Sequence, residues 1–267
     1  MSTSHTVAVS FYVQVAENRY EATELTRGPW DAGSQHAGPP AALLGRAVER
    51  RPDARADMRV ARLTYDIHRP VPVAAVTVAV RTVRSGRSID VVEAELGPDG
   101  GPVVMRVSVL LIRTAPGAAP SVPAVTGPPG PDAAAVQEFF PVGYETGYHT
   151  AMEVRFASGA FLTPGPATAW FRMRVPLVEG EEPSPLVRVL AAADSGNGIS
   201  SVLDWRRHLF INADLTVHLY RYPAGEWVCL DAQTLIDAAG IGLADTALLD
   251  EAGPIGRAAQ SLFVAER

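Results

Sequence analysis

The sequence predicts an α+β protein made of two similar halves, each with antiparallel strands and one apolar helix. The first observation is a repeat, because LTYDIHRP (63–70) is similar to LTVHLYRY (215–222) and GPVVMRVSVLL (101–111) to GPIGRAAQSLF (253–263). Both pairs are separated by 152 residues. The second is one apolar helix pattern in each half, and the third is a set of segments that alternate with the period of a strand. Together they favour a curved antiparallel sheet around a helix, present twice and joined side by side.

The helix of the first half is expected over residues 38–51, where Pro39 and Pro40 suit the first turn and the apolar side chains share one stripe. The second is expected in SPLVRVLAAADSGNG (184–198). There Ser184 would cap the helix, a proline would take its first position, and Gly196 would supply a left-handed end. These signals favour a helix over a buried strand leading into a nucleotide-binding loop.

The strands follow each helix. Apolar residues alternate in the first half at 76–80, 89–93 and 103–107. This period of two is typical of antiparallel strands with one buried face.

A proline-rich stretch separates the two halves. Six prolines between residues 116 and 131 exclude both a helix and a central strand there. We therefore expect an N-terminal domain at 1–115, a linker at 116–137, and a C-terminal domain at 138–267 that carries the active site.

The composition excludes several classes of protein. A net charge of −6 argues against binding to nucleic acid or to an anionic membrane, and the uncharged stretches are interrupted by proline and glycine. The first residues lack the pattern of a signal peptide, and the one cysteine, Cys229, excludes an internal disulfide. We expect a cytoplasmic protein and an inert, buried thiol.

Comparison of the two helices singles out Asp194. Aligning the apolar stripes pairs it with Val48, so that a carboxylate replaces an apolar residue at the edge of a buried face. The helix dipole disfavours a negative charge in the last turn, and burial adds a cost unless polar partners compensate. A carboxylate held at the edge of a buried face in this way is a candidate general base, a group that takes a proton from water during catalysis. A solvent-facing aspartate at a frayed helix end fits the sequence equally well.

Two further polar residues of the second half occupy positions at which the first half has a different residue. Gln260 alternates with apolar residues of the last strand, and its counterpart at the 152-residue offset is Ser108. A buried amide needs partners, either a carboxylate with a water or the backbone at a bulge. Asn212 pairs with Val60, yet its strand pattern directs it away from the apolar face unless the strand is irregular there.

Other motifs give weaker indications. The six histidines show no spacing typical of metal ligands, and we expect neither a metal nor another cofactor. No G-x-S-x-G motif is present, which argues against a serine nucleophile. Asp31 and His36 loosely match the Asp/His pair of hydratases, although A-G-S-Q stands between them where Asn-Pro is expected.

The order of five segments along the chain resembles the acyl-CoA thioesterase II (TesB-like) family. They are QHAGPPAALLGRAVE, RPVPVAAVTVAVRTVRSGRSIDVVEAEL, AADSGNG, FINADLTVHLYR and GRAAQSLFV. The resemblance implies a double hot-dog fold, in which each antiparallel sheet wraps around a central helix. It also implies catalysis without a metal or a covalent intermediate, by an aspartate, a glutamine and a threonine that activate water. These positions fall on Asp194, Gln260 and Asn212, the last where several members have threonine.

The expected reaction is hydrolysis of an acyl-CoA or acyl-carrier thioester. Asp194 would take a proton from a water held by Gln260 and Asn212, and backbone N–H groups near the start of the 38–51 helix would stabilise the oxyanion. A non-catalytic acyl-thioester-binding protein and an enoyl-thioester hydratase using Asp31 and His36 are the alternatives. By family analogy we expect a homo-oligomer, a dimer or tetramer.

Overall fold

The computed structural model describes residues 9–120, 127–137 and 142–267. The expected linker therefore contains a segment, 121–126, that lies outside the described residues. The same holds for residues 138–141, where the second domain was expected to begin, and for the first eight residues. The domain boundaries stay a prediction.

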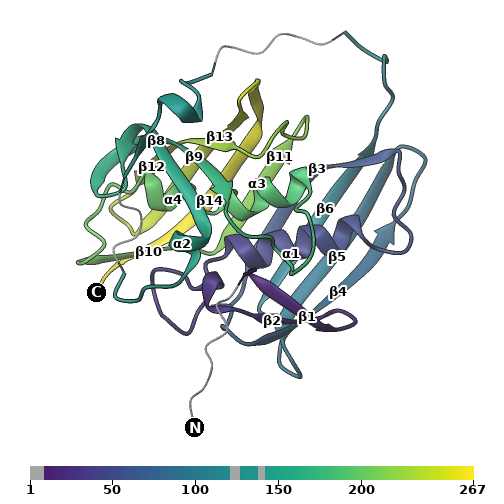
Figure 1. The fold of residues 1–267 in the computed structure, drawn as a ribbon, viewed down its shortest axis with the longest axis horizontal. Coiled ribbons are helices and arrows are strands. Elements are labelled where there is room, and N and C mark those ends of the chain that lie inside the picture. Colours follow the sequence, from purple (N-terminus) through teal and green to yellow (C-terminus); the bar gives the residue numbers. More distant parts are fainter. Residues whose placement is uncertain (1–8, 121–126, 138–141) are drawn as a thin grey trace.

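The described strands form a single sheet of 14 strands that curves around the helices (Figure 1). In the first half they are β1 (Tyr12–Ala16), β2 (Arg19–Ala22), β3 (Met58–Ile67), β4 (Ala75–Arg84), β5 (Ile89–Pro98) and β6 (Met105–Arg113). In the second half they are β7 (Ala135–Val136), β8 (Met152–Ala160), β9 (Thr163–Met173), β10 (His208–Asn212), β11 (Asp214–Leu219), β12 (Val228–Ile236), β13 (Ile241–Asp250) and β14 (Gly253–Glu266).

The strand order reflects the duplication. It runs β1-β2-β4-β5-β6-β3-β11-β14-β13-β12-β9-β8-β7, and β10 pairs with β14. The halves meet where β3 pairs antiparallel with β11, with Thr64 opposite Thr216. These two residues are separated by the same 152 positions as the sequence repeat. The two expected sheets are joined side by side, and the β3–β11 hydrogen bonds make them one continuous sheet.

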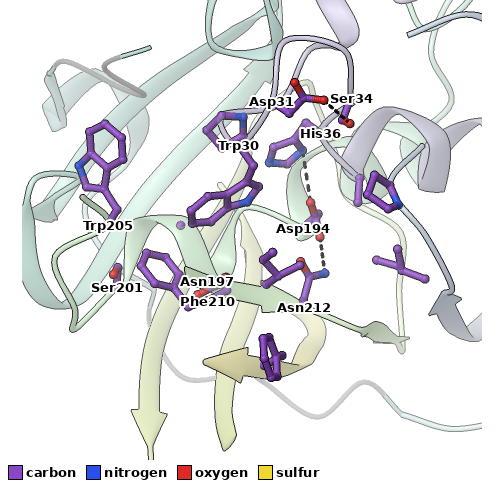
Figure 2. Close-up of a pocket in the computed structure, with 18 of the residues that line it drawn as sticks. Trp30, Asp31, Ser34, His36, Asp194, Asn197, Ser201, Trp205, Phe210 and Asn212 are labelled. Atoms are coloured by element: carbon purple, nitrogen blue, oxygen red, sulfur yellow. Dashed lines mark hydrogen bonds and ion pairs between the residues drawn. The ribbon is translucent and has the colours of Figure 1, made fainter. Parts of the chain in front are cut away.

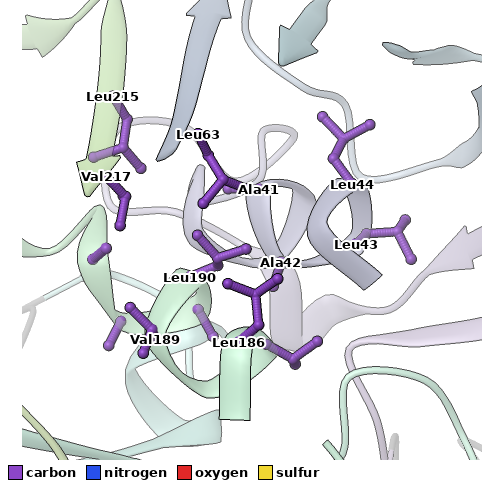
Figure 3. Packing of buried hydrophobic residues seen from close by; sticks show 14 of the residues in the cluster. Ala41, Ala42, Leu43, Leu44, Leu63, Leu186, Val189, Leu190, Leu215 and Val217 are labelled. Atoms are coloured by element: carbon purple, nitrogen blue, oxygen red, sulfur yellow. The ribbon is translucent and has the colours of Figure 1, made fainter. Parts of the chain in front are cut away.

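Two helices pack against each other beside this sheet, α1 (Gly38–Glu49) and α3 (Pro185–Ala193). Figure 3 shows Leu186 and Leu190 of α3 close to α1, with Leu63 of β3 nearby. The helix axes approach closely because Gly45 has no side chain where a Cβ would collide with Leu190. Each fully buried leucine contributes about 1.5–3 kcal/mol to this core. Shorter helical elements are α2 (Tyr148–Ala151), α4 (Gly196–Ile199), η1 (Glu24–Thr26) and η2 (Pro131–Ala133).

Helix α3 begins as its sequence predicts. The Ser184 side chain accepts a hydrogen bond from the Val187 N–H at 3.2 Å, and Pro185 takes the first helical position. Its end differs from the expectation, since Gly196 does not have a left-handed conformation but opens α4. A glycine is needed there for another reason: a Cβ would collide with the Thr246 hydroxyl on β13.

A one-residue irregularity separates β10 from β11. Asn212 pairs with Leu262 of β14, whereas Thr216 pairs with Ala259, so the register shifts by one residue between them. The Asp214 side chain compensates by accepting a hydrogen bond from the Ser261 N–H at 2.6 Å. A bulge of this kind reverses the face that the preceding residues present.

Candidate active site

Asp194 lies at the end of α3 with only 8% of its surface exposed. Its Oδ1 accepts a hydrogen bond from Asn212 Nδ2 at 2.8 Å and another from Gln260 Nε2 at 3.1 Å. The alternative of a frayed, solvent-facing aspartate is therefore wrong. The three residues selected from the sequence come together around one carboxylate oxygen, and Figure 2 shows two of them, Asp194 and Asn212.

Gln260 is buried behind Asp194. Its Nε2 also donates to the backbone carbonyl of Asp194 at 3.1 Å, and its Oε1 accepts the Asn197 N–H at 3.0 Å. The amide thus fixes both the carboxylate and the turn that follows α3. The carboxylate and two backbone groups together satisfy the buried amide.

The counterpart of Gln260 in the first half is corrected by the strand register. Ser108 lies opposite Thr64, and Ala259 lies opposite Thr216, so Ser108 matches Ala259. The next residue, Val109, then matches Gln260, and Val109 is fully buried. Val48 and Val60, the counterparts of Asp194 and Asn212, are buried too. Three polar residues of the second half thus replace three core valines of the first.

Asn212 faces the site because of the bulge. Regular alternation would direct Asn212 away from the apolar face, but the strand is irregular here, and Phe210 is buried whereas Ile211 is exposed. Asn212 Nδ2 donates to Asp194 and also to the Asp214 carbonyl at 3.2 Å. Its carbonyl oxygen makes no hydrogen bond to the described residues and is free to accept one from a ligand or water.

His36 is a further member of the site, contributed by the first half. Its Nδ1 lies 3.3 Å from Asp194 Oδ2 and accepts the Gly38 N–H at 3.1 Å. Burial lowers the pKa of His36, and the negative charge of Asp194 opposes this effect. The imidazole is therefore neutral at neutral pH.

Tyr148 of α2, in the second half of the chain, packs against the His36 imidazole of the first half. The two rings are stacked, with centroids 3.8 Å apart and planes 1° from parallel. The Tyr148 hydroxyl donates to the Ala191 carbonyl at 2.8 Å and lies 2.9 Å from Ser195 Oγ. Burial raises the pKa of Tyr148 well above its usual value, so the hydroxyl stays protonated.

The sequence loosely matched His36 with Asp31, and the structure places another carboxylate, Asp194, beside the imidazole. Asp31 is exposed and accepts a hydrogen bond from the Ser34 hydroxyl at 2.9 Å, while Asp194 faces the imidazole. A signal for the correct pairing was present, because His36 comes two residues before the helix that packs on α3. The pairing itself depends on the contact between helices, which periodicity does not reveal.

The oxyanion site expected near the start of the 38–51 helix stays a prediction. The Gly38 N–H is bound to His36 Nδ1, and the Ala41 N–H is bound to the Ala37 carbonyl. Pro39 and Pro40 have no N–H group. A donor for a substrate carbonyl would therefore come from outside these four positions, for example from the N–H of Ala37, which directly precedes α1 and has no hydrogen-bond partner among the described residues.

These groups lie in the wall of a cavity of about 830 Å³. His36, Asp194 and Asn212 line it, whereas Gln260 is not among its lining residues. The rest of the wall is largely apolar and aromatic, which suits a hydrocarbon or aryl group. Its large apolar members are Ile67, Val71, Trp30, Phe161, Leu162, Leu203, Trp205, Phe210, Ile211 and Phe263.

Two kinds of feature are absent from the described residues, 9–120, 127–137 and 142–267. No group of three His, Cys, Asp or Glu side chains there is arranged to hold a metal ion. Among the helices described, none combines the length and apolar character needed to cross a membrane. The thiol of Cys229 is buried, and burial raises its pKa, so it is not a nucleophile.

Solved structures share this fold. A proposed thioesterase II from Thermobifida fusca YX is 19% identical, with a TM-score of 0.76 and 96% of each chain covered. A hot-dog-fold protein of unknown function from Alicyclobacillus acidocaldarius is 13% identical, with a TM-score of 0.74 over 96% of this chain and 97% of that chain. The acyl-CoA thioesterase II TesB2 of Mycobacterium marinum is 14% identical, with a TM-score of 0.67 over 96% of this chain and 95% of that chain. At these identities the likeness shows the hot-dog fold.

Family models extend the comparison to the sequence. No curated protein matches the chain significantly. The model of the acyl-CoA thioesterase N-terminal domain matches residues 26–112, and that of the C-terminal domain matches residues 117–264. The second model alone spans more than half of the chain, and the chain therefore belongs to the acyl-CoA thioesterase family.

Proposed function

We propose that the protein hydrolyses acyl-CoA or acyl-carrier thioesters with a water activated by Asp194. The observation that carries the proposal is the single buried carboxylate in the wall of a mostly apolar cavity, held through Oδ1 by two amide groups. Because Oδ1 is occupied, Oδ2 is the oxygen that receives a proton. A positioned carboxylate of this kind acts as a general base.

Asn212 is the residue that contacts the water together with Asp194. Its Nδ2 is used by Asp194 and Asp214, which leaves its Oδ1 on the cavity side. A water that donates one hydrogen to Asp194 Oδ2 and the other to Asn212 Oδ1 directs a lone pair away from both. That lone pair attacks the thioester carbonyl carbon.

Gln260 acts through Asp194 in this proposal. Its side-chain amide is already bonded to Asp194 and to the Asn197 N–H, and it stands behind the cavity wall. It therefore orients the base. This role differs from the direct contact with the water that the family resemblance implies.

The reaction balances without a further reactant. The water oxygen forms a bond to the carbonyl carbon as its proton passes to Asp194, and the carbon–sulfur bond then breaks. The thiolate leaves with a proton as a free thiol, and the acyl group leaves as a carboxylic acid. The apolar cavity wall holds the acyl group, whose burial favours binding.

The expected homo-oligomer remains part of the proposal. Large apolar side chains on the outer face of the sheet are exposed and adjacent: Leu235 is paired with Leu243, and Ile241 lies two residues from Leu243 on the same strand, β13. A second copy covering these side chains would remove them from water. Light scattering that shows only monomers at micromolar concentration would contradict this part.

A thioester panel tests the function. The protein is incubated with acyl-CoAs of graded chain length, an aryl-CoA and an enoyl-CoA, while free thiol is followed with a chromogenic reagent and binding by calorimetry. Thiol release with turnover supports the proposal. Binding without release would identify a binding protein, and loss of the enoyl double bond without release would identify a hydratase. Either outcome contradicts hydrolysis.

A further inference from the structure

The two oxygens of Asp194 have different surroundings. Oδ1 accepts hydrogen bonds from Asn212 and Gln260, and both donors are amides that cannot take up a proton near neutral pH. Oδ2 faces the ring of His36 at 3.3 Å. The side of the carboxylate that is open to proton transfer is therefore the side next to the imidazole.

The hydrogen bond from Gly38 defines which nitrogen of His36 carries a proton. Because Nδ1 accepts the Gly38 N–H, it bears a lone pair, and the proton of the neutral ring is on Nε2. The lone pair of Nδ1 and a carboxylate oxygen without a proton are both acceptors, so they do not bond to each other. Once Oδ2 is protonated, its O–H can donate to the Nδ1 lone pair, which it then shares with the Gly38 N–H.

We propose that His36 is a positioning residue for Asp194, which accepts a hydrogen bond from the carboxyl group after that group has taken the proton of the water. This inference rests on the proposed function. The interaction forms only when the proton moves, and an interaction that strengthens toward the transition state increases kcat rather than substrate affinity. No group is consumed, since the carboxyl proton passes on to the leaving thiolate.

The position of the ring is fixed from several sides. Tyr148 stacks on one face, and the Tyr148 hydroxyl is tied to Ala191 at the end of α3. The His36 N–H donates to the Thr26 carbonyl at 2.8 Å. The ring is 6% exposed, as expected for a residue that must keep one orientation.

The charged groups around His36 identify Asp194 as its partner. On the neighbouring η1 turn, Glu24 is paired with Arg27, and on the same loop Asp31 is bonded to Ser34. Tyr148 remains protonated because burial raises its pKa. Asp194 lies against the ring, with Oδ2 3.3 Å from Nδ1.

Two substitutions separate the proposed role from a structural one. His36→Phe keeps a ring to stack on Tyr148 but removes the Nδ1 acceptor. His36→Asn keeps an acceptor within reach of the Gly38 N–H, two residues ahead, as in an Asx turn. We expect both to lower kcat about 10- to 100-fold, since misplacement of a catalytic group has effects of that size. KM should change little. His218→Asn, at an exposed position of β11, is the control.

The kinetic outcomes are distinguishable. If His36→Phe retains the wild-type kcat, or if His36→Asn restores it fully, the histidine only supports the loop and the inference is wrong. If the wild-type protein releases no thiol, the proposed function itself fails. A folded His36→Phe variant with normal kcat beside an inactive Asp194→Asn variant would overturn only the role of His36.

An NMR titration tests the contact without any activity. The pKa of the His36 imidazole is measured from its ring resonances in the wild type and in Asp194→Asn. Because the negative charge of Asp194 raises the pKa of His36, its removal should lower that pKa further. The ring nitrogen shifts should show the proton on Nε2 at neutral pH. An unchanged pKa, or a proton on Nδ1, would contradict the inference.

Discussion

Asn212 Nδ2 lies 2.8 Å from Asp194 Oδ1, and this hydrogen bond connects the end of β10 to the end of α3. The bond exists because a bulge follows Asn212 and directs its side chain inward. Local irregularity of the sheet therefore places a polar group that a regular strand would direct outward. The chemistry proposed for the site depends on this connection, and the following predictions test its parts.

At position 212, a hydroxyl should partly replace the amide. Threonine and valine have nearly the same shape, so Asn212→Thr and Asn212→Val differ mainly in hydrogen bonding. We expect Thr to retain about tenfold more kcat than Val, which corresponds to one hydrogen bond of about 1.4 kcal/mol. Steady-state kinetics on the best thioester of the panel measures the ratio. Equal rates for the two variants would show that hydrogen bonding at position 212 is unimportant.

Replacement of Gln260 should affect both stability and turnover. Gln260→Leu fills a similar volume but leaves the Asn197 N–H and two oxygens of Asp194 without this partner. Unsatisfied buried groups cost about 1–3 kcal/mol, which should appear as a lower free energy of unfolding in a denaturant titration. We also expect a fall in kcat. Ser261→Ala, at the exposed neighbouring position, is the control; the two variants should not have equal stability.

Two glycines at the contact between α1 and α3 should respond differently to alanine. A Cβ on Gly38 collides with the backbone carbonyl of Ala191, whereas one on Gly45 meets the end of the flexible Leu190 side chain. We expect Gly38→Ala to lower the free energy of unfolding by about 1–3 kcal/mol. Gly45→Ala should cost less, because alanine favours a helix by about 1 kcal/mol over glycine. The reverse order would show that the helices separate easily.

Stability should depend on pH through buried histidine. Burial lowers the pKa of His36 and of His149, so in the folded protein both resist protonation. As pH falls below about 6.5, unfolded chains take up protons that the folded protein does not, and the free energy of unfolding decreases. The decrease stops once pH passes the lowered folded pKa. Denaturant titrations at pH 7.5, 6.5 and 5.5 should show this decrease in the free energy of unfolding. In the His36→Phe variant the decrease should be smaller. If the free energy of unfolding changes equally with pH in the wild type and in His36→Phe, His36 makes no contribution to the pH dependence.

Much of the fold follows from local patterns. The cap at Ser184 and the proline after it define the start of α3, and the 152-residue repeat appears in the register of Thr64 opposite Thr216. Comparison of the halves also identified Asp194, because a carboxylate within an apolar stripe is conspicuous beside its counterpart Val48. These features depend on neighbouring residues or on a repeat, and both can be read along the chain.

Other features depend on contacts between distant segments. The bulge after Asn212 is stabilised by Asp214 across the strand pair, and alternation alone predicted the opposite face. Gly196 looks like a helix end in the sequence, yet it is required by its close approach to Thr246. His36 meets Asp194 only because α1 packs on α3. Such relationships are tertiary, so the sequence pattern could not supply them.

The most direct test of the central claim compares kcat for the wild type and Asp194→Asn on the best thioester substrate. Asparagine has the same shape and can still accept the hydrogen bonds of Asn212 and Gln260, but it cannot take a proton from water. Asp99→Asn, in an exposed ion pair with Arg19, is the matched control. We expect Asp194→Asn to lower kcat about 100- to 10,000-fold, the usual contribution of a general base, with an unchanged unfolding midpoint. A folded Asp194→Asn variant that retains a kcat close to that of the wild type would contradict the account.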